Sequence, residues 1–186
     1  DPEWVQSGVL FLDTPMENRI SDWAARYQTR VQTIDAQQLR QLEPELVETT
    51  ATGLLLPDVA QIRNPLLCSA LSRALQLQGV DLREHTEVTG LCIKSNAIQG
   101  VKTADGDLSA ERVVIAGGAW SSLIMRQAGL ELAVEPVLGQ MIMFEARPGL
   151  LGHITMCGDY YLIPRQNGLV LAGSTLEHTG YTKKTT

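Results

Sequence analysis

The stretch Arg112–Leu123, which reads RVVIAGGAWSSL, constrains the fold of this chain more than any other. A short apolar run, Val113–Ala116, stops at Gly117–Gly118 and is followed by a helix-like segment. A buried strand that breaks at paired glycines allows a backbone to approach a ligand closely. Open α/β sheets bind ligands beyond the carboxyl ends of their strands. The stretch therefore indicates either a ligand-contacting turn or a tight connection without a ligand, and spacing alone favours neither.

Composition excludes several classes of protein. The chain has 186 residues, of which 44% are hydrophobic and 19% charged, as in ordinary folded proteins. A net charge of -6 disfavours a nucleic-acid partner. We find no signal peptide and no apolar run near the roughly 20 residues that a membrane-spanning helix needs. Three widely spaced cysteines favour reduced thiols and a cytoplasmic location. Because the chain begins Asp-Pro-Glu, we expect a segment of a longer protein.

Periodic apolar residues and capping signals predict four helices. Asp35 followed by Gln38 is typical of a capping box, and Pro44 closes that helix. Asn64–Pro65 is a helix start, and Gly79 stands where a left-handed C-cap belongs. The helices are expected over 17–30 (apolar face Ile20, Trp23, Ala24, Tyr27), 35–43, 64–79 (apolar stripe Leu67, Ala70, Leu71, Ala74, Leu75) and 119–127.

Short apolar runs bounded by turn residues predict the strands. Ser95–Asn96 and Asn167–Gly168 are typical of hairpin turns, and Gly139 interrupts one long strand. With the helices, these strands predict an α/β fold (α+β mixed) whose sheet is antiparallel or mixed. The strands are expected over 8–13, 31–34, 52–56, 80–83, 88–94, 97–103, 108–116, 134–145, 160–164 and 169–172.

The common catalytic motifs are missing from the sequence. It contains no P-loop, no G-x-G-x-x-G, no nucleophile elbow and no C-x-x-C. A metal site is far less favoured than surface polar residues, so no metal and no catalytic residue are assigned. The set weighed for that site was His153, Cys157, Asp159 and His178.

Two further features of the sequence are notable besides the turn at Gly117–Gly118. The first is Gly139 inside an apolar strand, which marks a bulge or a close approach by a backbone or a ligand. The second is the segment Asp159–Arg165, in which Tyr160 and Tyr161 alternate between opposite faces of a strand. A phenol at a cavity can hold a small carboxylate by O–H donation. The alternative is that all these residues are simply the core and rim of a sheet.

Taken together and in order, several motifs resemble the D-amino-acid oxidase superfamily of flavoproteins, most closely the glycine oxidases of thiamine biosynthesis. The similarity extends over essentially the whole chain, and the combination is more specific than any one piece. The matching pieces are Asp35–Leu39 through Glu43–Pro44, Arg63–Pro65 with the helix to Val80, Thr86–Gly90, Ala116–Ser121, Pro136–Gln140, Tyr161–Arg165 with Gly168, Gly173–Thr175 and Glu177.

This resemblance implies an FAD lobe and a substrate lobe whose segments alternate along the chain. Residues 1–60 and 131–186 would belong to the substrate lobe, and 61–130 to part of the FAD-binding α/β lobe. The implied substrate is a small amino acid, oxidised by hydride transfer from its α-carbon to the flavin. Tyr161 resembles the tyrosine beside the substrate carboxylate. The implied cofactor contacts are Val88, Ala116, Gly117, Gly118 and Trp120.

The chain also departs from that family. The G-x-G-x-x-G turn that binds the FAD pyrophosphate is missing, as is the later segment with the arginine that binds the substrate carboxylate. Leu138 stands where many relatives have arginine. We therefore expect the isolated segment to lack FAD and activity. A non-catalytic α/β binding or assembly module, a D-amino-acid dehydrogenase relative and a sarcosine oxidase relative stay open, as does a homo-oligomer.

Overall fold

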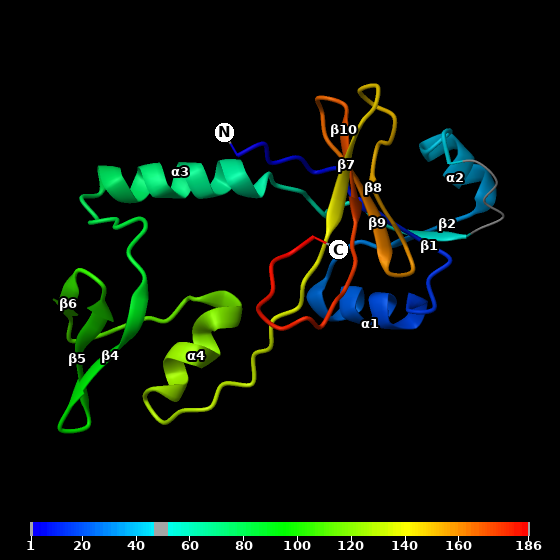
Figure 1. Ribbon diagram of the computed structural model, residues 1–186. Helices are drawn as coiled ribbons and strands as arrows, with labels where there is room; N and C mark the ends of the chain where they lie inside the picture. The colour runs from blue at the N-terminus through cyan, green and yellow to red at the C-terminus, as the bar shows by residue number, and fades with distance from the viewer. Residues whose placement is uncertain (1, 47–51, 186) are drawn as a thin grey trace. The chain divides into compact units, whose positions relative to one another are not determined.

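The computed structural model describes residues 2–46 and 52–185, and the chain divides into two compact units (Figure 1). The larger unit comprises Asp1–Ala74 and Gly139–Leu176. The smaller unit comprises Leu75–Leu138 and Glu177–Thr186. Each unit is therefore built from two segments that are far apart in the sequence. The chain is a mixed α/β protein, as predicted.

Seven strands of the described residues form the mixed sheet of the larger unit, in the order β2-β3-β1-β8-β9-β10-β7. Within it β1 pairs parallel with β8, and the other pairings are antiparallel. The predicted hairpin across Arg165–Gly168 is confirmed, since the Arg165 amide donates to the Leu169 carbonyl at 2.7 Å. The strands are β1 (Val9–Leu12), β2 (Gln32–Ile34), β3 (Gly53–Leu56), β7 (Met141–Glu145), β8 (Ile154–Cys157), β9 (Tyr160–Pro164) and β10 (Leu169–Gly173).

The core lies on both faces of β1 and β3, because successive strand residues point to opposite sides. Leu10 and Leu12 of β1 pack with Leu39 of α2 (Ala36–Leu42). On the other face, Val9 packs with β3 residues and with Ile20 of α1 (Glu17–Tyr27). The two helices thus cover opposite faces of the sheet, and every residue of β3 is buried.

The capping box predicted for α2 is confirmed. The Asp35 carboxylate accepts hydrogen bonds from the Gln37 and Gln38 amides, both at 2.8 Å. The Gln38 side chain accepts the Asp35 amide at 2.9 Å in return. The first helix is shorter than predicted, because Gln28 adopts a left-handed conformation and ends α1 after Tyr27.

Helix α3 (Asn64–Leu77) begins and ends close to the predicted positions. Gly79 has a φ of 77°, and the following Val80 amide donates to the Leu75 carbonyl at 3.1 Å, so the predicted C-cap is confirmed. None of the helix residues is buried, although the stripe includes Leu71 and Leu75. The predicted apolar stripe is therefore present but uncovered within the described residues.

The smaller unit contains a three-stranded antiparallel sheet in the order β4-β5-β6. The predicted turn between β4 (Val88–Lys94) and β5 (Ala97–Thr103) is confirmed, since Ser95 and Asn96 both have positive φ. Strand β6 (Gly106–Ser109) pairs with β5. A 3-10 turn, η1 (Gly118–Trp120), then leads into α4 (Ser121–Arg126).

Several predicted strands were wrong. Residues 80–83 form no strand, and the strand expected over 108–116 ends at Ser109. The run Val113–Ala116 pairs with no strand of the described residues, and Val114 is 91% exposed. A strand needs a neighbouring strand for its backbone hydrogen bonds. An apolar run in the sequence predicts burial, but it does not identify such a neighbour. The strand expected over 134–145 is reduced to β7, whereas β8 was not predicted at all.

Candidate functional site

An open cavity of about 710 Å³ in the smaller unit is lined in part by Gly117 and Trp120, the two ends of the glycine turn, which we define as Gly117–Trp120. Its size falls in the range of small-molecule and cofactor sites. Most of the lining side chains are apolar. The apolar lining residues are Val88, Leu91, Val101, Val113, Val114, Ile115, Ala116, Trp120, Leu123 and Ile124. The other lining residues are Glu87, Thr89, Gly117 and Gln127.

Local backbone geometry builds the glycine turn. The Trp120 amide donates to the Gly117 carbonyl at 3.0 Å, which closes the 3-10 turn. Gly118 has a φ of 54°, a left-handed conformation that favours glycine. A Cβ atom added at Gly118 would meet nothing within 4 Å, so the turn presents bare backbone to open space.

A side-chain hydrogen bond joins two residues that line the cavity, Gln127 and Thr89. The Gln127 amide nitrogen donates to the Thr89 carbonyl at 2.8 Å, which ties the residue after α4 to β4. Gly90 makes room for it, since a Cβ there would lie 2.4 Å from the Gln127 side-chain oxygen. A register shift between Val88 and Gly90 interrupts the β4–β5 pairing at the same place.

The structure brings together four of the five residues predicted to contact the cofactor. Val88, Ala116, Gly117 and Trp120 all line the cavity. Gly118 follows in the turn but is not among the lining residues. Val88 thus meets residues at least 28 positions further along the sequence at one apolar surface. The role of these residues in cofactor binding stays a prediction.

Tyr161, predicted to contact the substrate, lies on β9 in the larger unit, opposite Gly173 of β10. A Cβ atom at Gly173 would lie 2.8 Å from the Tyr161 hydroxyl oxygen and 2.9 Å from the ring carbon Cζ. The phenol therefore occupies the space that a side chain at Gly173 would need. Its neighbour Tyr160 points away and is 72% exposed, as strand alternation predicts.

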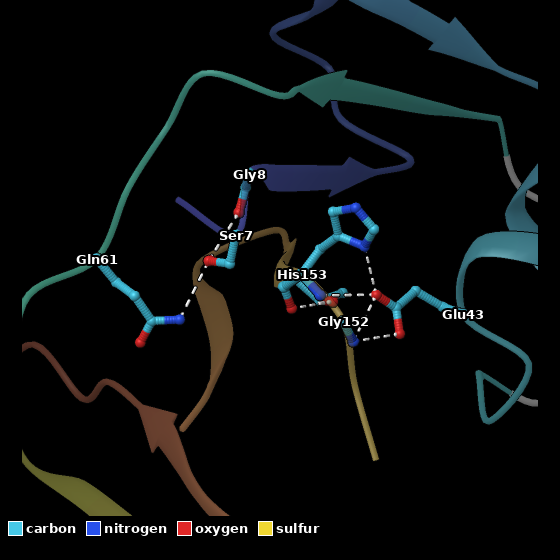
Figure 2. A network of polar contacts seen from close by, with 7 residues as sticks. Ser7, Gly8, Glu43, Gln61, Gly152 and His153 are labelled. Carbon is cyan, nitrogen blue, oxygen red and sulfur yellow. Dashed lines mark hydrogen bonds and ion pairs between the residues drawn. The ribbon is translucent and has the colours of Figure 1, made fainter. Parts of the chain in front are cut away.

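A buried carboxylate that we did not single out as a site residue lies in the larger unit (Figure 2). Glu43, 1% exposed, follows α2 and accepts the Gly152 amide at 2.9 Å and the His153 amide at 2.8 Å. The ring Nδ1 of His153 lies 2.6 Å from the same oxygen. Glu43 thereby ties the end of α2 to the start of β8. An acidic residue at a helix C-terminus opposes the helix dipole, and this feature of the sequence could have indicated a tertiary role for Glu43.

A second polar cluster joins three segments of the larger unit. The Gln61 side-chain nitrogen donates to the Pro164 carbonyl at 2.9 Å and to the Ser7 hydroxyl at 3.1 Å. Arg165 Nη1 donates to the Gln61 side-chain oxygen at 2.8 Å. Burial lowers the pKa of the Arg165 guanidinium, so the Gln61 oxygen compensates part of its lost hydration.

The described residues contain no group of three or more metal-binding side chains. Within the same residues, no helix combines the length and apolar character that crossing a bilayer would require.

Comparison with known proteins agrees with this architecture. The family described as DAO, FAD dependent oxidoreductase, matches residues 1–186. Glycine oxidase of Pseudomonas putida is 41% identical over 187 residues, covering 100% of this chain and 51% of that protein. The bifunctional protein ThiO/ThiG of Nostoc is 32% identical over 152 residues, covering 80% of this chain and 22% of that protein.

The fold comparison leads to the same group. The crystal structure of glycine oxidase from Geobacillus kaustophilus superposes with a TM-score of 0.88 at 30% identity, covering 99% of this chain and 50% of that one. The chain belongs to the DAO family of FAD-dependent oxidoreductases. It spans about half the length of the curated glycine oxidase relatives it matches.

Proposed function

We propose that the chain is part of an FAD-dependent amino-acid oxidase of the glycine oxidase type, which deaminates a small amino acid oxidatively. The observation that carries the proposal is 41% identity to a glycine oxidase across the whole chain. The apolar cavity around the glycine turn supports it. Segments 1–60 and 131–186 would form the substrate lobe, and 61–130 part of the FAD lobe.

The residues around the cavity fit part of an FAD molecule. Apolar side chains suit a planar aromatic ring system, and the bare backbone at Gly118 leaves space beside it. Val88, Ala116, Gly117, Gly118 and Trp120 would hold the cofactor. The flavin, when bound, accepts a hydride from the amino-acid α-carbon.

Tyr161 would hold the substrate. A phenol donates one hydrogen bond, which suits a carboxylate, and Gly173 leaves the space that this ring occupies. No residue of the chain is needed for proton transfer, because the protein supplies binding and orientation while the cofactor supplies the chemistry.

The chain alone would hold no FAD and have no activity. It contains no G-x-G-x-x-G turn, the element that binds the pyrophosphate at a helix N-terminus. We expect the purified 186-residue chain to be colourless and to release no peroxide with any amino acid. A yellow chain with amino-acid-dependent peroxide release would contradict this.

The decisive experiment uses the complete reading frame that contains the chain. We expect a yellow protein that consumes dioxygen with glycine, tested beside sarcosine and D-alanine. Preference for sarcosine, or for a dye in place of dioxygen, would favour a sarcosine oxidase or a D-amino-acid dehydrogenase relative. A protein that neither binds FAD nor oxidises an amine would indicate a non-catalytic binding module and overturn the proposal.

A further inference from the structure

The strap, which we define as Glu177–Lys183, contacts the glycine turn within the smaller unit. It is anchored where Leu138 and Glu177 exchange two backbone hydrogen bonds, each of 2.9 Å. Beyond that anchor the strap carries two side chains, Tyr181 and Lys183, that reach the turn and the start of α4. The contact therefore joins residues about 60 positions apart in the sequence.

The hydroxyl group of Tyr181 links the turn to α4. It donates to the Ala119 carbonyl at 3.1 Å, and it lies 3.2 Å from the Ser122 hydroxyl. A phenol carries one proton, so Ser122 is the donor in the second bond. Ser122 is 2% exposed and Tyr181 is 39% exposed, so the hydroxyl pair is partly buried.

Trp120 receives two further contacts from the strap. Its ring centroid lies 5.8 Å from that of Tyr181, at an interplanar angle of 45°. The Lys183 ammonium lies over the indole, 4.6 Å from its centroid, within the range of a cation–π interaction. Trp120 is also a lining residue of the cavity. The strap thus contacts the indole that forms part of the cavity wall.

We infer that Tyr181 is a positioning residue, assisted by Lys183, that fixes the Ala119 carbonyl and the Trp120 indole so that the glycine turn presents one set surface to the cavity. Without these contacts the turn keeps its local backbone hydrogen bonds, from the Trp120 amide to the Gly117 carbonyl and from the Ser121 amide to the Gly118 carbonyl, and a left-handed glycine. Its effect on FAD binding rests on the proposed function. The contact between strap and turn does not.

The first test examines the strap without a cofactor. Trp4 and Trp23 are replaced by phenylalanine in the 186-residue chain, so that Trp120 is the single tryptophan. In that background, Tyr181→Ala should shift the emission of Trp120 to longer wavelength and raise its quenching by acrylamide. Lys183→Met should change its emission intensity, whereas Lys184→Met, the matched charge control, should not. Emission unchanged by both Tyr181→Ala and Lys183→Met would overturn the inference.

The second test uses the complete reading frame and FAD itself as the probe. Tyr181→Phe keeps the ring but loses the bond to Ala119, and should weaken FAD binding about fivefold, as expected for one hydrogen bond. Its thermal midpoint and circular dichroism identify any loss of folding separately. Wild-type FAD affinity in Tyr181→Phe would overturn the role in cofactor positioning. If the unaltered protein binds no FAD, the proposed function fails. The fluorescence test alone then shows whether the strap positions Trp120.

Discussion

One carboxylate oxygen of Glu43 contacts the backbone amide of His153 at 2.8 Å and its ring Nδ1 at 2.6 Å. A buried carboxylate has lost its hydration, so each hydrogen-bond donor that is removed lowers the stability of the fold. The end of α2 and the start of β8 are therefore joined through the hydrogen bonds of one buried carboxyl group.

We expect Glu43→Gln to lower the free energy of unfolding by about 2 kcal/mol, since an amide offers one acceptor oxygen and places an NH₂ group near the donors. Urea denaturation measures the change. The control is Glu45→Gln, which removes an exposed ion pair with Arg147 and should cost less than about 1 kcal/mol. Equal losses in both variants would contradict a special role for Glu43.

The contact between Tyr161 and Gly173 predicts a steric effect. Gly173→Ala should cost about 1–3 kcal/mol, because the new methyl group would overlap the Tyr161 ring and the Met141 side chain. Gly139→Ala is the matched control, since its Cβ would meet the Thr175 carbonyl at an ordinary 3.4 Å. Thermal denaturation compares the two. A destabilised Gly139→Ala beside an unchanged Gly173→Ala would show that the ring does not occupy this space.

The Gln61 cluster predicts coupling between two side chains. Gln61→Leu should cost about 2 kcal/mol, because it removes the hydrogen bonds of Gln61 to the Pro164 carbonyl and to the Arg165 guanidinium. A double-mutant cycle with Arg165→Met should give a coupling energy of roughly 1 kcal/mol. Gln6→Leu, which removes an exposed bond to the Pro57 carbonyl, is the control and should be near neutral. Additive effects of Gln61→Leu and Arg165→Met would exclude the coupling.

The ion pair of Arg30 with Asp58 predicts a pH dependence. The hydrogen bond from Arg30 lowers the pKa of the Asp58 carboxyl below its ordinary value. Because the folded pKa lies below the unfolded one, the contribution is present above the unfolded pKa, about 3.9, and is lost as the pH falls through the folded pKa. Carbon NMR should give an Asp58 midpoint below the ordinary aspartate value, rising in Arg30→Gln. An unchanged midpoint would contradict the pairing.

Local signals in the sequence predicted local structure well. The Asp35–Gln38 capping box and the Ser95–Asn96 turn need only neighbouring residues, so their geometry is encoded where they occur. Strand β8 was missed because Thr155, 4% exposed, places a hydroxyl where an apolar residue would have completed the run. Its hydroxyl bonds to the His153 carbonyl at 3.4 Å.

Long-range contacts were beyond sequence reasoning. The residues grouped around the cavity could be anticipated through the family resemblance, but not the reach of Tyr181 to Ala119, since nothing local marks a tyrosine as a partner of a distant carbonyl. The same holds for Val113–Ala116, whose apolar sequence is that of a strand although the described residues provide no pairing partner. The residue types favour a strand, but a strand forms only where a neighbouring strand pairs with it.

The uncovered stripe of α3 has a consequence for amide hydrogen exchange. A helix of 14 residues that buries none of its side chains depends on its own propensity, and helices of that length are marginal in water. Its amides should therefore exchange through local fraying, while those of β1 and β3, which lie in the core, wait for global opening. Amide exchange along this chain should therefore give two ranges of opening free energy, with α3 in the lower range.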